Sequence, residues 1–340
     1  MKKLACFGAG RIGQVHATNA AAQLGVALIY LVDPVDTPAR TELAAHTGAN
    51  ITNTDTVFDD PSIDGILIAS STNSHGDLLM RAAKAGKAVF CEKPISLDFA
   101  LTQQVMEAVE ASGIPCMMGF QRRYDASFRA VHARIASGMS GSLEQLTMFS
   151  RDPSPPPRSY VETSGGMFRD STIHDADMAR FLLAEEIATV YAVGACLISD
   201  EIGVAGDVDT LMVTLTTVSG RMANITACRR GPMGYDQRLE ALCAREVLNV
   251  ENQTQTHMTV SSADGKRLAA PENYFIERFR QAYAAEMEAF VDLLENGKAP
   301  LAGIRDGYEA QRLVEAALQS YQTGVPVAFG ADWTPQGGAA

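Results

Sequence analysis

Hydrophobic and polar positions follow two different patterns along the chain. Up to about residue 120, short apolar runs typical of buried strands are separated by longer segments with helical spacing. The apolar runs are Leu4–Phe7, Leu28–Val32, Gly65–Ala69, Ala88–Cys91 and Pro115–Met118. Segments such as Ile12–Leu24, His75–Ala85 and Leu97–Ser112 are long enough to connect parallel strands. This pattern predicts a doubly wound parallel α/β domain over residues 1–120.

From residue 121 the chain changes to successive strands joined by short polar turns, with helical patterns at Asp125–Ser137 and Ser171–Leu183. The strand-like runs are Glu144–Ser150, Thr189–Ile198, Thr210–Val218, Met222–Arg229, Arg238–Leu242 and Met258–Val260. Hairpin-linked strands beside a few helices predict an α+β domain with a large, mostly antiparallel open sheet over residues 121–330.

Two longer helical patterns close the chain, at Tyr274–Glu295 and Arg305–Tyr321, and a glycine follows each. The pattern leaves open whether these helices pack on the first or the second domain. Residues 331–340 are expected to form a frayed tail.

Composition narrows the function classes. The 28 basic and 40 acidic residues give a net charge of −12, which disfavours nucleic acid as a partner. We find no apolar run of about 18 residues and no secretory signal pattern, so we expect no membrane partner. The six cysteines are scattered without C-x-x-C spacing, which indicates reduced thiols in a cytoplasmic protein.

The clearest motif is a glycine-rich loop, G-x-G-x-x-G, which follows the first strand directly and opens a helix. Gly8 permits the tight turn, Gly10 lets the backbone approach a pyrophosphate, and Gly13 lets helix and strand pack closely. Arg11 and Ile12 begin the helix, whose N-terminus offers N–H groups to an anion. The motif predicts a dinucleotide-binding Rossmann domain; the structural alternative is a glycine turn that binds nothing.

Asp33 ends the second strand, 20 residues after Gly13. A carboxylate there can accept hydrogen bonds from the adenosine ribose and would repel a 2′-phosphate, and the following Pro34-Val35 offers no cation. These features favour NAD over NADP as the cofactor. The alternative is that Asp33 caps a turn.

The ends of the third and fourth strands supply further candidates, because ligands of open parallel sheets bind outside the carboxyl ends of the strands. Lys93 lies there, within Glu92-Lys93-Pro94, and can donate a hydrogen bond to a substrate hydroxyl; a solvated surface lysine is the alternative. The expected cofactor contacts from these two strand ends are Ser71, Thr72, Asn73, His75, Glu92 and Lys93.

The stretch 170–177, DSTIHDAD, admits three interpretations. On a helix Asp170 and His174 would share one face, but no further histidine cluster or cysteine pair is near in sequence, which argues against a metal site. Asp170 could instead cap the helix above a structural histidine. The third interpretation is a proton relay in which His174 is the general base, Asp170 orients it or the substrate, and Lys93 stabilises alkoxide charge.

These motifs together resemble the glucose-fructose oxidoreductase/inositol dehydrogenase/rhizopine catabolism family, and within it the inositol 2-dehydrogenases. The similar segments are the glycine loop, Glu92-Lys93-Pro94, Gly119–Asp125, Ser150–Pro153, Ser164–Gly166, 170–177, Gly234–Arg238 and Tyr274–Phe290. The resemblance implies NAD-dependent oxidation of myo-inositol, a cyclic polyol, to 2-keto-myo-inositol, with Lys93, Asp170 and His174 as the catalytic residues.

It also implies that the second domain binds the substrate and forms a homotetramer. Besides the three catalytic residues, the implied substrate contacts are Arg122, Asp152, Thr172 and Tyr235. Gln121 stands where many relatives carry asparagine, so the preferred stereoisomer stays open. The alternatives are a dehydrogenase for scyllo-inositol, D-chiro-inositol or an aldose, and a non-catalytic NAD-sensing regulator.

Overall fold

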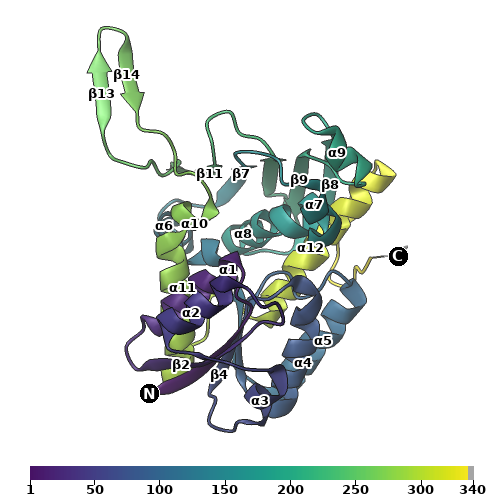
Figure 1. Cartoon of the computed structure of the whole chain (residues 1–340). Helices are drawn as coiled ribbons and strands as arrows, with labels where there is room; N and C mark the ends of the chain where they lie inside the picture. The colour runs from purple at the N-terminus through teal and green to yellow at the C-terminus, as the bar shows by residue number, and fades with distance from the viewer. Residues whose placement is uncertain (336–340) are drawn as a thin grey trace. The chain divides into compact units, whose positions relative to one another are not determined.

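A computed structural model of the chain describes residues 1–335. The backbone divides into two compact units (Figure 1). The first consists of Met1–Tyr124 and Gln281–Glu309, and the second of Asp125–Arg280 and the chain from Ala310 onward. The sequence pattern left the two closing helices unassigned; one now belongs mainly to the first unit. The expected tail at 331–340 lies partly outside the described residues.

The first unit contains a six-stranded parallel sheet in the order β3-β2-β1-β4-β5-β6. The strands are β1 (Lys2–Phe7), β2 (Val26–Val32), β3 (Asn50–Ile51), β4 (Gly65–Ile68), β5 (Ala88–Glu92) and β6 (Cys116–Gly119). The helices are α1 (Arg11–Ala21), α2 (Pro38–Thr47), α3 (Thr54–Asp59), α4 (His75–Ala85), α5 (Phe99–Ser112) and α11 (Arg280–Asn296). Two 3₁₀ turns complete it, at Thr72–Ser74 and Gln121–Tyr124.

The sheet is covered on both faces, as its sequence requires. Every residue of β4 and β5 is buried, which fits strands packed on both sides. Figure 1 shows α1 and α2 on one side of the strands and α4 and α5 on the other. The late helix α11 places the ring of Phe290 against Phe90 of β5, in space left by Gly65. The predicted parallel α/β domain is confirmed.

The second unit is built around a seven-stranded sheet in the order β12-β11-β7-β10-β9-β8-β15. Its strands are β7 (Leu143–Arg151), β8 (Ile187–Ala195), β9 (Thr210–Thr217), β10 (Met222–Cys228), β11 (Asp236–Cys243), β12 (Val247–Val250) and β15 (Val327–Ala328). Its helices are α6 (Ala126–Ala136), α7 (Arg158–Ser164), α8 (Ile173–Leu183), α9 (Asp200–Val204) and α10 (Phe275–Arg278), and α12 (Ile304–Thr323) runs into it from the first unit. The predicted α+β class is confirmed, although β7 and β10 pair in parallel.

One face of this sheet carries the helices and the other is open. Alternate residues of β9 are buried and exposed, as expected of a strand covered on one face only. Val193 and Met212, paired across β8 and β9, are both exposed on the open face. No element of the described residues covers Val193 and Met212 on this face.

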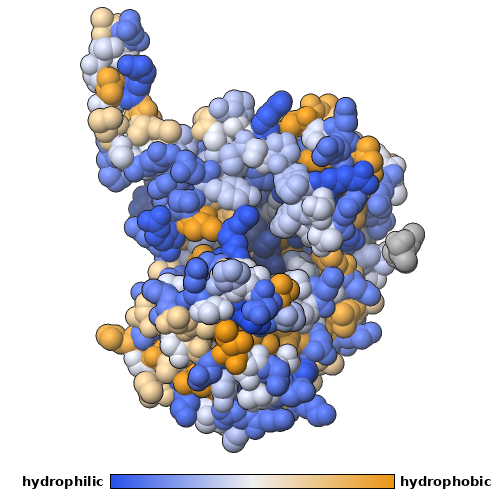
Figure 2. All heavy atoms as spheres, viewed as in Figure 1, coloured by the Kyte–Doolittle hydropathy of each residue, from blue (hydrophilic) through white to orange (hydrophobic). Residues whose placement is uncertain are grey.

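Three local predictions were wrong. Met258–Val260 does not join the large sheet; β13 (Thr259–Ser262) pairs with β14 (Gly265–Leu268) in a separate hairpin. This hairpin projects from the rest of its unit and carries hydrophobic and hydrophilic residues side by side (Figures 1 and 2). The helix expected over Tyr274–Glu295 is interrupted at Phe279, whose ring is buried and whose backbone leaves the helical region.

The third error concerns the helix start near residue 171. Met167–Thr172 form a π-helical turn, and α8 begins only at Ile173. Asp170 therefore lies in the wider π-helical turn, whereas His174 lies on the first turn of α8. Among the described residues, no helix combines the length and the apolar character needed to cross a bilayer.

Candidate active site

The glycine loop has the geometry that close backbone approach requires. Gly8 has φ +103°, and a Cβ there would lie 2.4 Å from the carbonyl oxygen of Ala69. A Cβ on Gly13 would lie 2.2 Å from the carbonyl oxygen of Gly8. Gly10, which caps α1, has no atom within 4 Å of its Cβ position, so a phosphate can approach the backbone there. Arg11 and Ile12 form the first turn of α1.

Asp33 braces this loop. One carboxylate oxygen accepts the N–H of Ala9 at 2.7 Å and the other accepts the N–H of Val35 at 2.9 Å. Each oxygen keeps a second lone pair for a ribose hydroxyl, so bracing and cofactor binding are compatible. A cation that the sequence analysis did not consider lies nearby: Arg40 of α2 donates to the Asp33 carbonyl oxygen at 3.0 Å and pairs with Asp36.

The segments after β4 and β5 are joined through His75. Its Nδ1 lies 2.8 Å from the carbonyl oxygen of Pro94, and its Nε2 lies 3.1 Å from that of Ser70. Burial is the main reason that the pKa of His75 is lowered. The imidazole therefore fixes the loop of Ser71, Thr72 and Asn73 relative to the Lys93–Pro94 turn.

Glu92 directs its carboxylate into the core of the first unit. Its Oε1 lies 2.7 Å from Nε2 of His16, and its Oε2 accepts the N–H of Lys93 at 3.2 Å. The carboxyl of Glu286 on α11 is fully buried, and no hydrogen-bond partner for it occurs among the described residues. Burial, and then the charge of Glu92, raise the pKa of Glu286 well above its ordinary value. Lys93 itself is half-buried.

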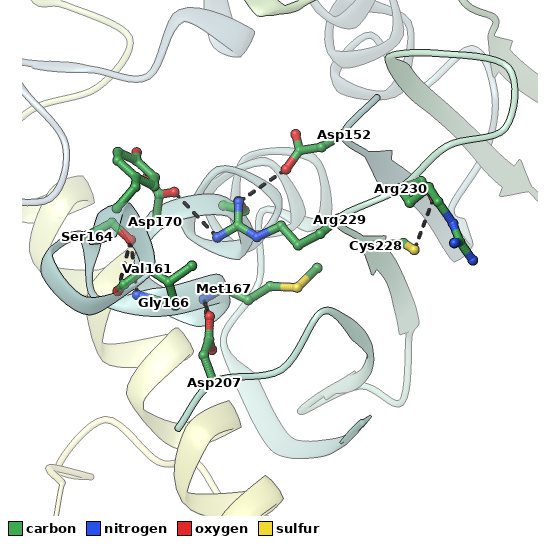
Figure 3. A network of polar contacts seen from close by, with 12 residues as sticks. Asp152, Val161, Ser164, Gly166, Met167, Asp170, Asp207, Cys228, Arg229 and Arg230 are labelled. Carbon is green, nitrogen blue, oxygen red and sulfur yellow. Dashed lines mark hydrogen bonds and ion pairs between the residues drawn. The ribbon is translucent and has the colours of Figure 1, made fainter. Parts of the chain in front are cut away.

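In the second unit Asp170 is held from two sides. Tyr160 of α7 donates its hydroxyl to Oδ1 at 3.1 Å, and Nη2 of Arg229 lies 3.5 Å from Oδ2. Nη1 of the same guanidinium lies 3.1 Å from Oδ2 of Asp152 and 2.6 Å from Oγ of Ser171. Figure 3 shows Arg229 between Asp152 and Asp170. Asp170 does not cap α8, which leaves that structural interpretation unsupported.

The backbone before Asp170 is fixed by Asp207. Gly166 has φ +74°, and a Cβ there would lie 2.7 Å from a carboxylate oxygen of Asp207. The same carboxylate accepts the N–H of Met167 at 2.8 Å. Burial raises the pKa of Asp207, while backbone N–H groups and the charge of Arg229 oppose the rise. Asp207 thus fixes the backbone where the Ser164–Gly166 segment meets the π-helical turn.

The remaining predicted residues of 170–177 differ in exposure. His174 is half-buried on the first turn of α8. Thr172 is buried, and its hydroxyl has no hydrogen-bond partner among the described residues. Asp175 accepts the hydroxyl of Ser150 at 2.6 Å, which ties α8 to β7. Asp175 therefore has a structural contact within the second unit.

Two further predicted contacts are buried. Arg122 lies on the 3₁₀ turn Gln121–Tyr124 of the first unit. Tyr235 of the second unit packs edge-on against Tyr274, with ring centroids 5.5 Å apart, and against Phe279. Within the described residues, no group of three or more histidine, cysteine and acidic side chains is arranged to hold a metal ion.

Known proteins similar to this chain match it over nearly its whole length. An oxidoreductase family model with an NAD-binding Rossmann fold matches residues 2–120, and the GFO/IDH/MocA C-terminal domain matches residues 128–249. Inositol 2-dehydrogenase from Rhizobium meliloti (strain 1021) is 40% identical over 92% of this chain and 95% of its own. The chain belongs to the GFO/IDH/MocA family.

Two solved structures of this family show the same fold. A myo-inositol dehydrogenase from Corynebacterium glutamicum ATCC 13032 has a TM-score of 0.93 and 40% identity, covering 97% of this chain and 99% of its own. A scyllo-inositol dehydrogenase from Lactobacillus casei, with bound NAD(H) and scyllo-inositol, has a TM-score of 0.88 and 27% identity, covering 96% and 98%. This chain is thus an NAD-binding oxidoreductase of the inositol dehydrogenase family.

Several residues that contact the predicted site residues or lie close to them were not identified in the sequence analysis. These are Arg229, Tyr160, Asp207, His16 and Glu286. The strand order gives the signal for Arg229, because β7 and β10 are parallel neighbours and Cys228 pairs with Arg151. The following residues, Arg229 and Asp152, therefore meet.

Proposed function

We propose that this chain is an NAD-dependent dehydrogenase that oxidises myo-inositol to 2-keto-myo-inositol. The observation that carries the proposal is the pairing of a glycine loop shaped for a dinucleotide with a second unit in which Asp170 is held close to the start of α8, where His174 lies. The similarity to inositol 2-dehydrogenase supports the choice of a cyclic polyol.

Oxidation of a secondary alcohol removes a hydride from the carbinol carbon and a proton from its oxygen. NAD supplies the hydride acceptor when it is bound. A side chain of the protein must accept the proton. We assign His174 as the general base, because imidazole accepts protons near neutral pH. Asp170 orients His174 or the substrate, and the Lys93 ammonium stabilises the charge that develops on the alcohol oxygen.

The cofactor contacts follow from the first unit. Gly10, Arg11 and Ile12 offer the loop and the helix N-terminus to the pyrophosphate. Asp33 accepts the ribose hydroxyls. The nicotinamide half is assigned to Ser71, Thr72, Asn73, His75, Glu92 and Lys93. Of these, His75 and Glu92 have side chains engaged within the unit, so they contribute by positioning their neighbours.

The substrate contacts are assigned by chemistry. A cyclic polyol presents only hydroxyls, which carboxylates and guanidinium groups bind well. Besides Lys93, Asp170 and His174, the proposed contacts are Arg122, Asp152, Thr172 and Tyr235. Tyr235 and Thr172 are buried, so only their hydroxyl ends are assigned to the substrate. We also propose that the protein is a cytoplasmic homotetramer. The open face of the second sheet would form the interface between its subunits.

A panel of substrates tests this function. Initial rates with myo-, scyllo- and D-chiro-inositol and with aldoses, each with NAD and NADP, should be highest for myo-inositol with NAD. Preference for scyllo-inositol is the second candidate, favoured by the Lactobacillus casei structure, in which that ligand is bound. Absence of turnover on every polyol would support the regulator alternative.

The same assay tests the catalytic residues. Lys93→Ala and His174→Ala should each lower kcat by roughly 100-fold or more, because each removes a group that acts on the reacting hydroxyl. NAD affinity should change little. Lys84→Ala and His257→Ala, both at exposed positions, are the matched controls. Unchanged turnover in either active-site variant would refute the role given to that residue.

A further inference from the structure

Arg229 lies at the centre of a cluster of carboxylates in the second unit. It directly follows β10, and its side chain is only 4% exposed. Its guanidinium contacts Asp152, which follows the neighbouring strand β7, and Asp170 of the π-helical turn. Asp207 contributes a third carboxylate to the field around Arg229. One cation therefore connects two strand ends and the turn that precedes α8 (Figure 3).

The neighbouring carboxylates stabilise the charged form of the buried Arg229 guanidinium. Burial opposes a charged guanidinium, but the carboxylates of Asp170 and Asp152 outweigh burial, and the pKa of Arg229 is raised. Conversely, without Arg229 three carboxylates would face one another with no countercharge from this position. Like charges disfavour the ionised form of each.

The contacts also fix the orientation of the Asp170 carboxylate. One oxygen of Asp170 accepts the Tyr160 hydroxyl and the other faces Arg229, so rotation of the carboxylate would break one contact or the other. Nη1 of Arg229 holds Ser171 at the same time, the residue directly after Asp170. Both the side chain and the backbone of the turn are therefore tied to one guanidinium.

We propose that Arg229 is a positioning residue for the proton-transfer step: it holds the Asp170 carboxylate in a fixed orientation and holds Asp152 beside it. This proposal rests on the proposed function, because it gives Arg229 a role through two residues assigned there. Arg229 is not itself given a contact with the substrate.

The groups that face Asp170 determine the expected pH dependence. They are the Tyr160 hydroxyl from α7, Arg229 from the end of β10 and Asp207 from the segment before β9, with His174 nearby in sequence on α8. Removing Arg229 takes away a positive charge next to Asp170 and leaves the negative charge of Asp207 close by. The acid limb of the kcat/KM profile should therefore move to higher pH.

The test compares Arg229→Gln, Arg229→Lys and Arg229→Ala with Arg230→Gln, since Arg230 is exposed and directed away from the cluster (Figure 3). Arg229→Gln should lower kcat/KM by roughly 100-fold with its acid limb at higher pH, because a misplaced catalytic group costs about that much. Arg229→Lys should retain the pH profile better, and added guanidinium should restore part of the activity of Arg229→Ala. NAD affinity, a property of the first unit, should be unchanged in all variants.

A loss of activity with an unshifted acid limb and no rescue by guanidinium would overturn the proposal, as would full activity of Arg229→Gln. If wild type oxidises a different polyol, the proposed substrate fails and the variants are judged on that polyol. If wild type oxidises no polyol, a crystal structure of Arg229→Gln tests the positioning role instead. Loss of the Tyr160–Asp170 hydrogen bond supports the positioning role, and an unchanged Asp170 carboxylate refutes it.

Discussion

The carboxylate of Asp33 has an observed structural role and a proposed role in cofactor binding. It accepts backbone N–H groups of Ala9 and Val35, which shapes the glycine loop, and we propose that it also binds the adenosine ribose. Arg40 donates to the carbonyl of the same residue, and its Nε has no hydrogen-bond partner among the described residues. The proposed preference for NAD over NADP should therefore depend on the negative charge of Asp33, which lies close to the positive charge of Arg40.

Replacing Asp33 with serine should weaken this preference. Repulsion of a 2′-phosphate disappears while Arg40 stays, so the ratio of kcat/KM for NADP to that for NAD should rise by roughly tenfold. Serine retains a hydroxyl for a loop N–H group. Steady-state rates with both cofactors measure the ratio. The gain should vanish in the Asp33→Ser, Arg40→Gln double variant; a gain that persists there would show that Arg40 does not receive the phosphate.

Glu286 is a second residue whose environment conflicts with its charge. Its carboxyl is fully buried near Glu92, so the folded state favours the protonated form. A carboxyl whose pKa is raised on folding contributes stability that is fully present below its unfolded value of about 4.5. That contribution is lost progressively as the pH rises toward the raised folded value.

Glu286→Gln should remove this pH dependence. Glutamine has the shape of a neutral carboxyl, so the variant should gain on wild type by at most about 1.4 kcal/mol in unfolding free energy per pH unit above pH ~5. Urea denaturation at several pH values measures the difference. Glu288→Gln, at an exposed position on the same helix, should follow wild type at every pH. Parallel curves for Glu286→Gln and wild type would show that Glu286 is ionised in the fold.

Among the helices and strands, those with a clear short-range sequence pattern were predicted correctly. The strands of the first unit were predicted because each apolar run is bounded by turn residues, whereas β3 has two exposed residues and gives no such signal. The helix break at Phe279 could not be predicted from the sequence, because neither glycine nor proline lies there. There, Arg278 forms a buried ion pair with Asp125 at 2.6 Å, a partner 153 residues away in sequence.

The candidate site shows the same limit. Glycine loop, Asp33 and Lys93 are local features at strand ends and can be found in the sequence. The π-helical turn that carries Asp170 has no distinctive spacing, and Arg229 meets Asp152 only because β10 lies parallel to β7. Sheet order is set by long-range packing, so this contact could not be predicted from the sequence.

At the scale of the whole molecule, the open face of the second sheet should decide assembly. Val193 and Met212 lie paired on this face and are 47% and 50% exposed. Apolar residues grouped on a sheet face are typical of surfaces that pair with another copy. The wild-type chain should sediment at four times its mass.

Changing both residues to lysine should place like charges on the face and produce smaller species in sedimentation velocity experiments. Leu24→Lys, which alters a turn residue of the first unit that is 96% exposed, should leave the assembly intact. Unchanged sedimentation of the double variant would exclude this face as the interface. A wild-type chain that sediments as a monomer would exclude the tetramer itself.

The division of the chain into units has a consequence for its synthesis. The first unit needs α11, which packs Phe290 against Phe90, and it needs Ala302, whose carbonyl oxygen accepts the N–H of Met118 in β6. Both belong to Gln281–Glu309, which leave the ribosome only after Asp125–Arg280 of the second unit have been made. At cellular translation rates that interval lasts on the order of ten seconds. Part of the apolar surface of the nascent dinucleotide-binding sheet therefore stays uncovered until this later helix has been made.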